Sequence, residues 1–548
     1  MNYRKPLTTL ATHRVENQPL PFEDVNRYSS DKALGEALRR EGAAFAEDSL
    51  VELGACVGSA GVQDKARQAN GHPPQLRAFD RFGQRIDEVE FHPAYHDLMR
   101  IGIEAGVASI AWTAPRGGHV AHAALLYLMT AADAGVCCPF SMTYASLPTL
   151  RREPELAEEW QPLLLSGRYD PDYRPAAGKS GVTIGMAMTE KQGGSDVRAN
   201  STRAEPLAID GEYELVGHKW FCSAPMSDGF FTLAQAKGGL TTFFVPRWRP
   251  DMSRNSMHIM RLKDKLGDRS NASAEIEYCG AWARRVGPEG QGVRMIIDMV
   301  AGTRLDCMVG SAALMRNAVA SAIWHCRQRK AFGRPLVEQV AMTKVLADLV
   351  LEHEAALVLA FRVARAFDDT ASRASATGLA RILTPIAKYW ICKRTPAVVY
   401  EAMECHGGNG YVEESPLPRY FRQSPLNSIW EGSGNVIALD VLRAIRGDPD
   451  LLDVLMSEFE PARGVDSRID QRLRELPELA RHLDEGTARH FVEQAAVTAQ
   501  AALLAMHAPT AVADGFASTR LETAASQTFG AFTAAIDCKA LLDRALPT

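Results

Sequence analysis

The hydrophobic pattern of the chain changes its period twice, near residues 180 and 285. Between these positions the apolar residues form short β-branched or aromatic runs, such as YELVGHKWFCS and LTTFFVP, separated by Gly, Asp, Asn and Pro. This pattern is typical of a compact antiparallel β-domain. Residues 31–179 and 286–447 instead carry apolar residues at every third or fourth position, as bundle helices do. The sequence therefore predicts a mixed but mostly α chain, with a β-domain over 180–285 between two helical domains.

The two ends of the chain extend this plan. Residues 1–30 follow neither period and are expected to form an extended arm lying on another part of the molecule. Residues 448–548 are expected to form a C-terminal helical extension, with 9 Lys and Arg against 16 Asp and Glu, in a chain of net charge −5. Asp and Glu are interleaved with its one basic cluster, which favours a salt-bridged, solvent-exposed face; the cluster comprises Arg463, Arg468, Arg472 and Arg474.

The composition excludes several classes of protein. At 46% hydrophobic and 23% charged it is that of an ordinary globular chain, and no uncharged stretch is long enough to cross a bilayer. The first residues lack the apolar segment of a signal peptide, and the ten cysteines form no CxxC pair, so we interpret them as reduced thiols. His92 and His96 have a metal-like spacing but no evident third ligand. We therefore expect a cytoplasmic protein without a metal centre or a membrane partner.

A carboxylate in an unusual setting is Glu431, in the stretch NSIWEGSGN (427–435). Its apolar neighbours Ile429 and Trp430 would desolvate it and raise its pKa, and Gly432 permits close approach of a ligand or a backbone. Glu431 is therefore a candidate general base for removing a proton from carbon. Taken alone, however, the stretch favours a helix N-terminus capped by Ser433.

Two further stretches contain groups that suit phosphates. MAMTEKQGGSD (186–196) leads from an expected strand into a Gly-rich loop with Thr189 and Ser195, whose backbone N–H groups suit a heterocycle edge and a pyrophosphate. RQRKAFGRPL (327–336) ends a long helix with arginines, which bind phosphate bidentately. Each stretch by itself is also a common structural feature, namely a hairpin and a basic helix C-terminus.

In this order the stretches resemble the acyl-CoA dehydrogenase family. TEKQGGSD is similar to its flavin loop, GHKWFCS to its second flavin strand and RQRKAFGRPL to its phosphate-gripping segment. HGGNGYVEESPLPRYFRQ and WEGSGN are similar to its closing signature and its catalytic turn. This resemblance covers about residues 100–446. The arm, the segment LKDKLGDRSNAS and the C-terminal extension resemble the AidB-type alkylation-response flavoproteins within that family.

The resemblance implies FAD as cofactor and a homotetramer whose subunits have an N-terminal helical domain, a β-domain and a four-helix bundle. It implies that Glu431 removes the α-proton of an acyl-CoA thioester while the β-hydride passes to the flavin, and that Arg443 pairs with Glu431. Arg329 and Phe332 would contact the FAD of a neighbouring subunit. The FAD of the same subunit would be held by Met186, Thr189, Ser195, Phe221, Cys222, Ser223, Trp430, Gly432, Ser433 and Asn435.

The chain departs from the family pattern at several positions. Phe221 stands where the family has a flavin-stacking Trp, and Trp220 lies one place earlier. Glu404, Gln423 and Val340 replace residues that the family uses for contacts with the FAD of a partner subunit. These three replacements weaken the expectation of a subunit-bridging site more than the expectation of FAD binding itself.

Three functions remain open at this stage. The first is a DNA alkylation-response flavoprotein that binds and protects double-stranded DNA, with weak or unknown dehydrogenase activity. The second is an ordinary dehydrogenase of short or branched acyl-CoA thioesters without a DNA role, and the third is a non-catalytic FAD-bound scaffold in which Arg443 locks Glu431. AidB-type extensions are associated with DNA, but neutralising phosphates requires cations and this extension is acidic.

Overall fold

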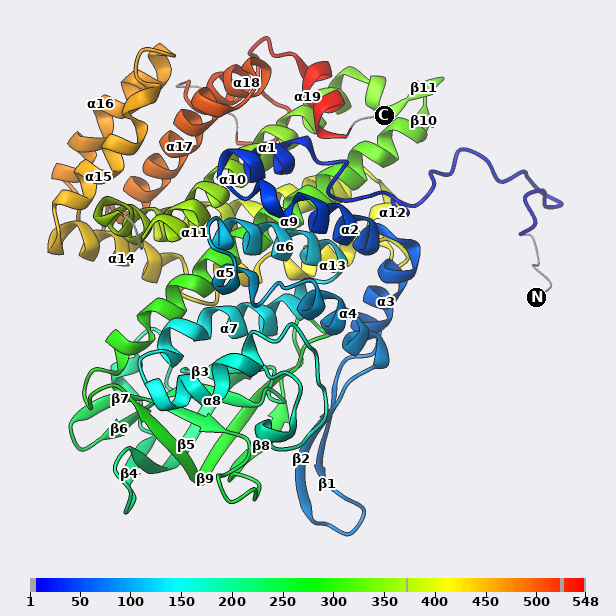
Figure 1. Ribbon diagram of the computed structural model, residues 1–548. Helices are drawn as coiled ribbons and strands as arrows, with labels where there is room; N and C mark the ends of the chain where they lie inside the picture. Colours follow the sequence, from blue (N-terminus) through cyan, green and yellow to red (C-terminus); the bar gives the residue numbers. More distant parts are fainter. Residues whose placement is uncertain (1–5, 371–372, 523–526, 547–548) are drawn as a thin grey trace.

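The computed structural model describes residues 6–370, 373–522 and 527–546. Figure 1 shows a β-domain at one end, long helices in the middle and further helices packed on the opposite end. The mostly helical chain with one large sheet confirms the expected fold class. No helix within these three ranges is long and apolar enough to cross a bilayer, and no three metal-binding side chains there gather into a candidate metal site.

Helices form most of the N-terminal part. Asp31 caps the first of them, because its side chain accepts a hydrogen bond from Leu34 N at 3.1 Å. The helix α6 contains no charged residue and is buried on almost every side. The helices are α1 (Lys32–Arg40), η1 (Ala44–Ala46), α2 (Glu47–Gly58), α3 (Ala60–Gly71), α4 (Pro93–Glu104), α5 (Ile110–Thr113), α6 (Gly118–Ala132), α7 (Ala134–Leu150) and α8 (Pro154–Leu164).

The β-domain is a seven-stranded sheet that closes on itself. Its order is β3-β6-β4-β5-β9-β7, with β7 pairing back to β6 and β8 pairing with β9. Most pairs are antiparallel as expected, but β3–β6 and β4–β6 are parallel, because the long loop after β3 returns the chain to the same end of the sheet. The strands are β3 (Ile184–Ala187), β4 (Arg203–Pro206), β5 (Glu212–Ser223), β6 (Gly229–Ala236), β7 (Gly239–Pro246), β8 (Met257–Leu262) and β9 (Ser273–Val286).

A hairpin that the sequence pattern did not predict interrupts the N-terminal helices. β1 (Gln75–Phe79) and β2 (Arg85–Glu90) pair antiparallel and project beside the β-domain (Figure 1). Asp87 of β2 accepts a hydrogen bond from Ile259 N of β8 at 2.8 Å. The two strands are short and polar, so their own periodicity is weak, and contact with the β-domain stabilises them.

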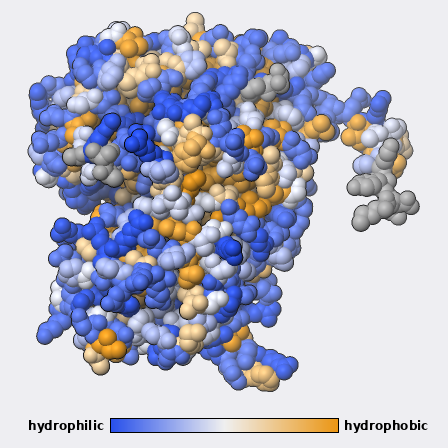
Figure 2. Space-filling model, viewed as in Figure 1, coloured by the Kyte–Doolittle hydropathy of each residue, from blue (hydrophilic) through white to orange (hydrophobic). Residues whose placement is uncertain are grey.

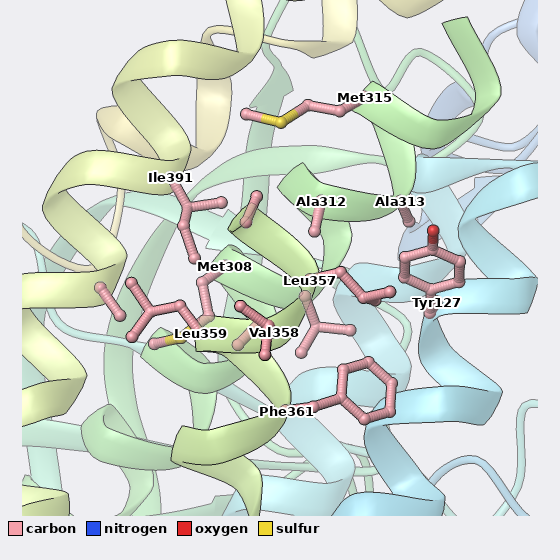
Figure 3. Close-up of a cluster of buried hydrophobic side chains, with 14 of the residues drawn as sticks. Tyr127, Met308, Ala312, Ala313, Met315, Leu357, Val358, Leu359, Phe361 and Ile391 are labelled. Carbon is pink, nitrogen blue, oxygen red and sulfur yellow. The ribbon is translucent and has the colours of Figure 1, made fainter. Parts of the chain in front are cut away.

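Long helices form the bundle. Figure 3 shows part of its core, a cluster of buried side chains that includes Met308, Met315, Leu357, Phe361 and Ile391. These apolar residues recur at helical spacing on facing helices, as expected. The elements are α9 (Gly292–Gln328), β10 (Lys330–Ala331), β11 (Arg334–Pro335), η4 (Leu336–Glu338), α10 (Val340–Asp369), α11 (Ala374–Glu404), α12 (Gly408–Tyr411), α13 (Leu417–Gln423), η5 (Leu426–Ser428) and α14 (Gly434–Gly447).

The C-terminal helices are tied to the bundle by buried ion pairs. Arg520 pairs with Asp348 and Glu352 of α10 at 2.6 and 3.0 Å, and Arg544 pairs with Glu354 of α10 at 2.9 Å. The α17 helix lies against α10, α11 and α14. The elements are α15 (Asp450–Phe459), η6 (Glu460–Ala462), α16 (Ser467–Arg481), α17 (Ala488–His507), α18 (Thr510–Arg520) and α19 (Cys538–Ala545).

The N-terminal arm divides into two stretches. Its first described residues extend away from the body (Figure 1). Further along, Asn17 Nδ2 donates to Lys330 O at 2.9 Å, and Leu20 O accepts from Trp324 Nε1 at 2.9 Å. The second stretch therefore lies against the C-terminal end of α9.

Candidate active site

Glu431 lies in a tight turn between η5 and α14. Its φ is +57° and that of Gly432 is +105°, so two consecutive residues occupy the left-handed region. A Cβ on Gly432 would lie 2.9 Å from Ile437 Cδ1, and glycine avoids both this contact and the backbone strain. The turn directs the Glu431 side chain toward α9, where Thr303 Oγ1 donates to Glu431 Oε2 at 2.9 Å.

Two cations hold the backbone of this turn. Arg304 Nε of α9 donates to Glu431 O at 3.0 Å. Lys388 Nζ of α11 donates to Trp430 O at 2.8 Å and to Gly432 O at 2.6 Å. We call Arg304 and Lys388 the carbonyl clamp. It places two positive charges beside Glu431 and keeps three consecutive carbonyl groups in a strained turn.

Burial raises the pKa of Glu431 above its ordinary value, although the Thr303 hydrogen bond and the charges of Arg304 and Lys388 act in the opposite direction. A carboxylate with a raised pKa is a stronger base than one in water. The desolvation of Glu431 that the sequence predicts is therefore present. The sequence did not predict the three groups that lower the pKa of Glu431, namely Thr303, Arg304 and Lys388.

Trp430 is positioned by a polar chain that begins on α9. Trp430 Nε1 donates to Asn427 Oδ1 at 2.8 Å, and Asn427 Nδ2 donates to Ser311 Oγ at 3.1 Å. The indole ring packs against the same buried cluster as Met186 of β3. This arrangement brings one residue from each of the two expected flavin-binding stretches to the α7 side of the β-domain.

The residues after Glu431 only partly follow the expectations. Ser433 occupies the N-cap position of α14, as the helix-start interpretation requires, but its side chain makes no capping hydrogen bond. Asn435 Oδ1 accepts from Arg489 Nη1 of α17 at 3.2 Å. Arg443 is exposed, and no hydrogen bond or ion pair in the described part of the chain joins it to Glu431. Arg443 comes two residues after buried Val441, and two residues correspond to a rotation of about 200° around the axis of α14. Arg443 therefore lies on the opposite face of the helix, and the expected Arg443–Glu431 pair is not formed here.

The Gly-rich loop is fastened by a buried ion pair that the sequence analysis did not identify. Glu190 Oε1 pairs with Lys219 Nζ of β5 at 2.9 Å, with both side chains fully buried. Glu190 Oε2 also accepts from Ser201 Oγ at 2.9 Å, and Oε1 from Thr202 N at 3.1 Å. Burial alone would raise the pKa of Glu190, but Lys219 and these hydrogen bonds hold it well below its usual range. Burial lowers the pKa of Lys219 to about 8 against the opposing effect of Glu190.

The expected flavin-contacting residues of the β-domain differ in exposure. Ser195 is fully on the surface of the loop and Phe221 is half exposed, whereas Cys222 is buried. Thr189 lies under Gly194, where an added Cβ would come within 2.4 Å of Thr189 Oγ1. The loop therefore requires glycine at position 194 and keeps its backbone close to Thr189.

Cys138 of α7 connects the β-domain side of the site with the bundle side. Burial is the main reason that the pKa of the Cys138 thiol is raised to about 12. Its side chain also interacts with Ser223 of β5, which lowers the pKa, and the charge of Glu431 is close enough to raise it. The structure thus gathers Met186, Ser223, Trp430 and Glu431 around α7.

Arg329 and Phe332 lie elsewhere. Arg329 comes 26 residues after Thr303 along α9, a distance of roughly 40 Å at 1.5 Å per residue. Phe332 is 97% exposed at the tip of the β10–β11 hairpin, with a φ of +51°. These two residues cannot reach the site of their own chain.

The comparisons with known proteins agree with this geometry. Residues 17–171 match the family model of the adaptive response protein AidB N-terminal domain, residues 185–280 that of the acyl-CoA dehydrogenase middle domain, and residues 290–446 that of the acyl-CoA dehydrogenase C-terminal domain. The chain is 45% identical over 515 residues to "Putative acyl-CoA dehydrogenase AidB" of Escherichia coli strain K12, covering 93% of this chain and 95% of that protein.

Two animal comparisons point the same way. The chain is 31% identical to "Acyl-CoA dehydrogenase family member 11" of Caenorhabditis elegans, covering 83% of this chain and 76% of that protein. The solved structure of Caenorhabditis elegans ACDH-11 in complex with C11-CoA superposes with a TM-score of 0.83 at 28% identity, covering 94% of this chain and 93% of that one. The chain therefore belongs to the acyl-CoA dehydrogenase family, and within it to the proteins that resemble AidB.

Proposed function

We propose that this protein is an FAD-dependent dehydrogenase of acyl-CoA thioesters in which Glu431 is the catalytic base. The observation that carries the proposal is the environment of Glu431, a half-buried carboxylate on a turn held by the carbonyl clamp, with its pKa raised by desolvation. A fixed backbone and a desolvated carboxylate are what proton removal from carbon requires.

The residues around α7 fit a flavin. Gly194 and Ser195 are both exposed, so a ligand can approach the loop backbone there and Ser195 adds a hydroxyl, which together suit a pyrophosphate. Flavin contacts on the β-domain side are assigned to Met186, Thr189, Ser195, Phe221, Cys222 and Ser223, and those on the bundle side to Trp430, Gly432, Ser433 and Asn435. When bound, FAD supplies the acceptor for the hydride that leaves the β-carbon of the substrate.

Glu431 itself handles the α-proton. Thr303 occupies Oε2, which leaves Oε1 to take the proton from the substrate. As the Glu431 charge is lost, Arg304 and Lys388 keep the turn in place because they bind backbone carbonyls rather than the carboxylate. Proton removal therefore requires no rearrangement of the turn.

The test is Glu431→Gln, compared with Glu52→Gln, which replaces an exposed carboxylate of α2. Both yellow proteins are mixed anaerobically with short and branched acyl-CoA thioesters, and the bleaching of the flavin is followed. We expect Glu431→Gln to retain FAD and to lose about 10²–10⁴-fold in bleaching rate, whereas Glu52→Gln behaves as wild type. Equal rates in both variants would remove Glu431 from the role of base.

We further propose that the protein binds double-stranded DNA through cations at the junction of α11, α14 and α17. Burial lowers the pKa of Lys393, and the positive charge of nearby Arg489 lowers it further. Within the described residues neither forms an ion pair with a carboxylate, and Arg443 is exposed on the adjoining helix. By contrast, Arg463, Arg468 and Arg472 are paired with Glu460, Asp466 and Glu475. The junction thus offers cations that phosphates can use.

A salt titration of duplex binding tests this second proposal. We expect affinity to fall steeply with salt, and the slope of log affinity against log salt to fall by about one in Arg489→Gln. Arg463→Gln is the matched control, because its arginine is already paired, and should leave the slope unchanged. Absence of duplex binding at low salt would leave the dehydrogenase proposal alone.

We also propose a homotetramer, which the positions of Arg329 and Phe332 support. Both lie at the far end of α9, and Phe332 is almost completely exposed on a hairpin tip. An exposed aromatic residue of this kind suits a contact with another copy of the chain. Light scattering of Phe332→Ser should give a smaller mass than that of the wild type.

A further inference from the structure

A line of hydrogen bonds joins the loop between β8 and β9 to the end of β5. Lys265 Nζ donates to Ser273 Oγ at 3.2 Å and to Asn271 O at 2.8 Å, and Ser273 Oγ lies 3.3 Å from Ser223 Oγ. Ser223 and Ser273 are direct partners across β5 and β9, which lie side by side in the sheet (Figure 1), so their side chains stand on the same face. We call Lys265, Ser273 and Ser223 the lysine–serine chain.

The direction of the hydrogen bonds is fixed at the lysine end. An ammonium group can only donate, so Ser273 Oγ accepts from Lys265 and directs its own hydrogen to Ser223 Oγ, its other hydrogen-bond partner among the described residues. The hydrogen of Ser223 is then directed onward to α7. Burial raises the pKa of the Cys138 thiol to about 12, and the Ser223 side chain opposes this rise, as a donor does. The chain therefore presents a hydroxyl hydrogen, supported by a positive charge, between β5 and α7.

Lys265 directs its charge at neutral oxygens rather than at a carboxylate. It is half-buried, and in the described part of the chain no carboxylate lies within ion-pair distance of its Nζ. Burial lowers the pKa of Lys265, and the charges of Asp268 and Asp133 act in the opposite direction and favour the charged form. Lys263, two residues earlier, instead pairs with Glu275 at 2.7 Å. The placement of Lys265 thus suits the polarisation of a hydroxyl group, whereas that of Lys263 suits an ion pair.

We propose that Lys265 and Ser273 are positioning residues that favour reduction of the flavin through Ser223. This inference rests on the proposed FAD site, to which Ser223 is assigned. A flavin that accepts a hydride takes up both electrons of the broken C–H bond, so its ring gains one negative charge. A hydroxyl donor supported by a cation stabilises such a charge. Removal of the cation should therefore make reduction of the bound flavin less favourable, although neither Lys265 nor Ser273 is assigned a contact with flavin or substrate.

Lys265 also has a structural contact, and the variants must separate it from the charge. Lys265→Met removes the charge together with the hydrogen bond to Asn271 O. Lys265→Arg keeps the charge. Ser273→Ala breaks the link to Ser223 and leaves the bond between Lys265 and Asn271 in place. A purely structural role would change the Tm of these variants without changing the redox properties of the flavin.

The reduction potential of the bound flavin tests the proposal, measured on the FAD-saturated full chain by equilibration with a dye of known potential. We expect Lys265→Met to lower the equilibrium constant for reduction about tenfold, a shift of about 30 mV to more negative potential for two electrons. Ser273→Ala should shift the potential in the same direction by less, and Lys265→Arg should stay close to wild type. Lys237→Met, which removes an exposed charge at the β6–β7 turn, should leave the potential unchanged. A wild-type potential in Lys265→Met would overturn the proposal.

The double variant and the flavin content complete the test. With Lys265→Met already present, Ser273→Ala should add little further shift, because the chain is already broken; fully additive shifts would make the two residues independent and overturn the proposal. If Lys265→Met does not fold, Ser273→Ala is compared with Ser273→Thr, which keeps the hydroxyl, and equal potentials in these two would overturn it. A wild type that binds no FAD would overturn the proposed function and this inference with it, whereas full FAD content with an unchanged potential in the variants would overturn the lysine–serine chain alone.

Discussion

Each half of the candidate site contains a carboxylate that is shielded from water, and the two carboxylates differ: Glu190 is fully buried and Glu431 is half-buried. In the β-domain, Glu190 forms an ion pair with Lys219, and its pKa is held well below the usual range. In the bundle, Glu431 also has cations beside it, but they bind backbone carbonyls, and its pKa is raised by burial. Burial alone therefore does not decide what a carboxylate does. Direct pairing suits Glu190 to anchor the loop, and desolvation without pairing suits Glu431 to the role of base that we propose for it.

The largest expected effect is at the anchor. Lys219→Met leaves Glu190 buried without its cation, and such a broken pair destabilises a protein by about 3–5 kcal/mol. Denaturant unfolding measures the loss. Combining Lys219→Met with Glu190→Gln should recover most of the stability, because no buried charge is left unpaired. If the double variant were no more stable than the single one, the pair would not be the anchor of this loop.

A smaller effect is expected at the base. Thr303→Val removes the hydrogen bond to Glu431 Oε2 with little change of shape. Because that hydrogen bond lowers the pKa of Glu431, its loss should raise the pKa and move the alkaline-rising limb of the flavin-bleaching rate to higher pH. Thr384→Val is the control, since Thr384 bonds only Ala380 O of its own helix. An unshifted limb in Thr303→Val would contradict the assignment of that limb to Glu431.

The smallest expected effects are those of pH on stability, which should be opposite in sign at the two carboxylates. The lowered pKa of Glu190 contributes stability above its ordinary value of 4.5 that is lost as the pH falls. The raised pKa of Glu431 lowers stability as the pH rises above 4.5. Relative to wild type at neutral pH, Glu190→Gln should therefore have a lower Tm and Glu431→Gln an equal or higher Tm. The Glu431 difference should shrink as the pH falls to 4.5, and the Glu190 difference only as the pH falls below 4.5; changes of the same sign at neutral pH would refute the contrast.

Much of the fold could be predicted because periodicity is a local property. The long apolar repeats of the bundle, seen at Met308, Leu357 and Ile391, arise from neighbouring residues and survive in the structure. The β1–β2 hairpin could not be predicted, because its stability depends on β8, which lies far along the chain. Figure 2 shows apolar residues gathered at the waist between the helical part and the β-domain, where the two predicted domains meet.

Glu431 could be identified from its own neighbours, whereas its partners could not. Thr303, Arg304 and Lys388 come from α9 and α11 and contain no local signal that relates them to a turn at residue 431. Arg443 illustrates the converse: the resemblance implied a pair with Glu431, but the helix turns this side chain outward. A position in the sequence does not by itself specify which face of a helix meets the site.

By itself the sequence determined the order of helical and β segments, the apolar and glycine neighbours of Glu431 and the Gly-rich loop, because these depend on residue types within a few positions. Only the tertiary structure decided which charges are paired. Lys219 reaches Glu190 across the sheet, while Lys265 reaches a hydroxyl and a carbonyl oxygen instead. Ion pairing depends on distances of a few ångströms between segments far apart in the chain, and such distances exist only once the chain has folded.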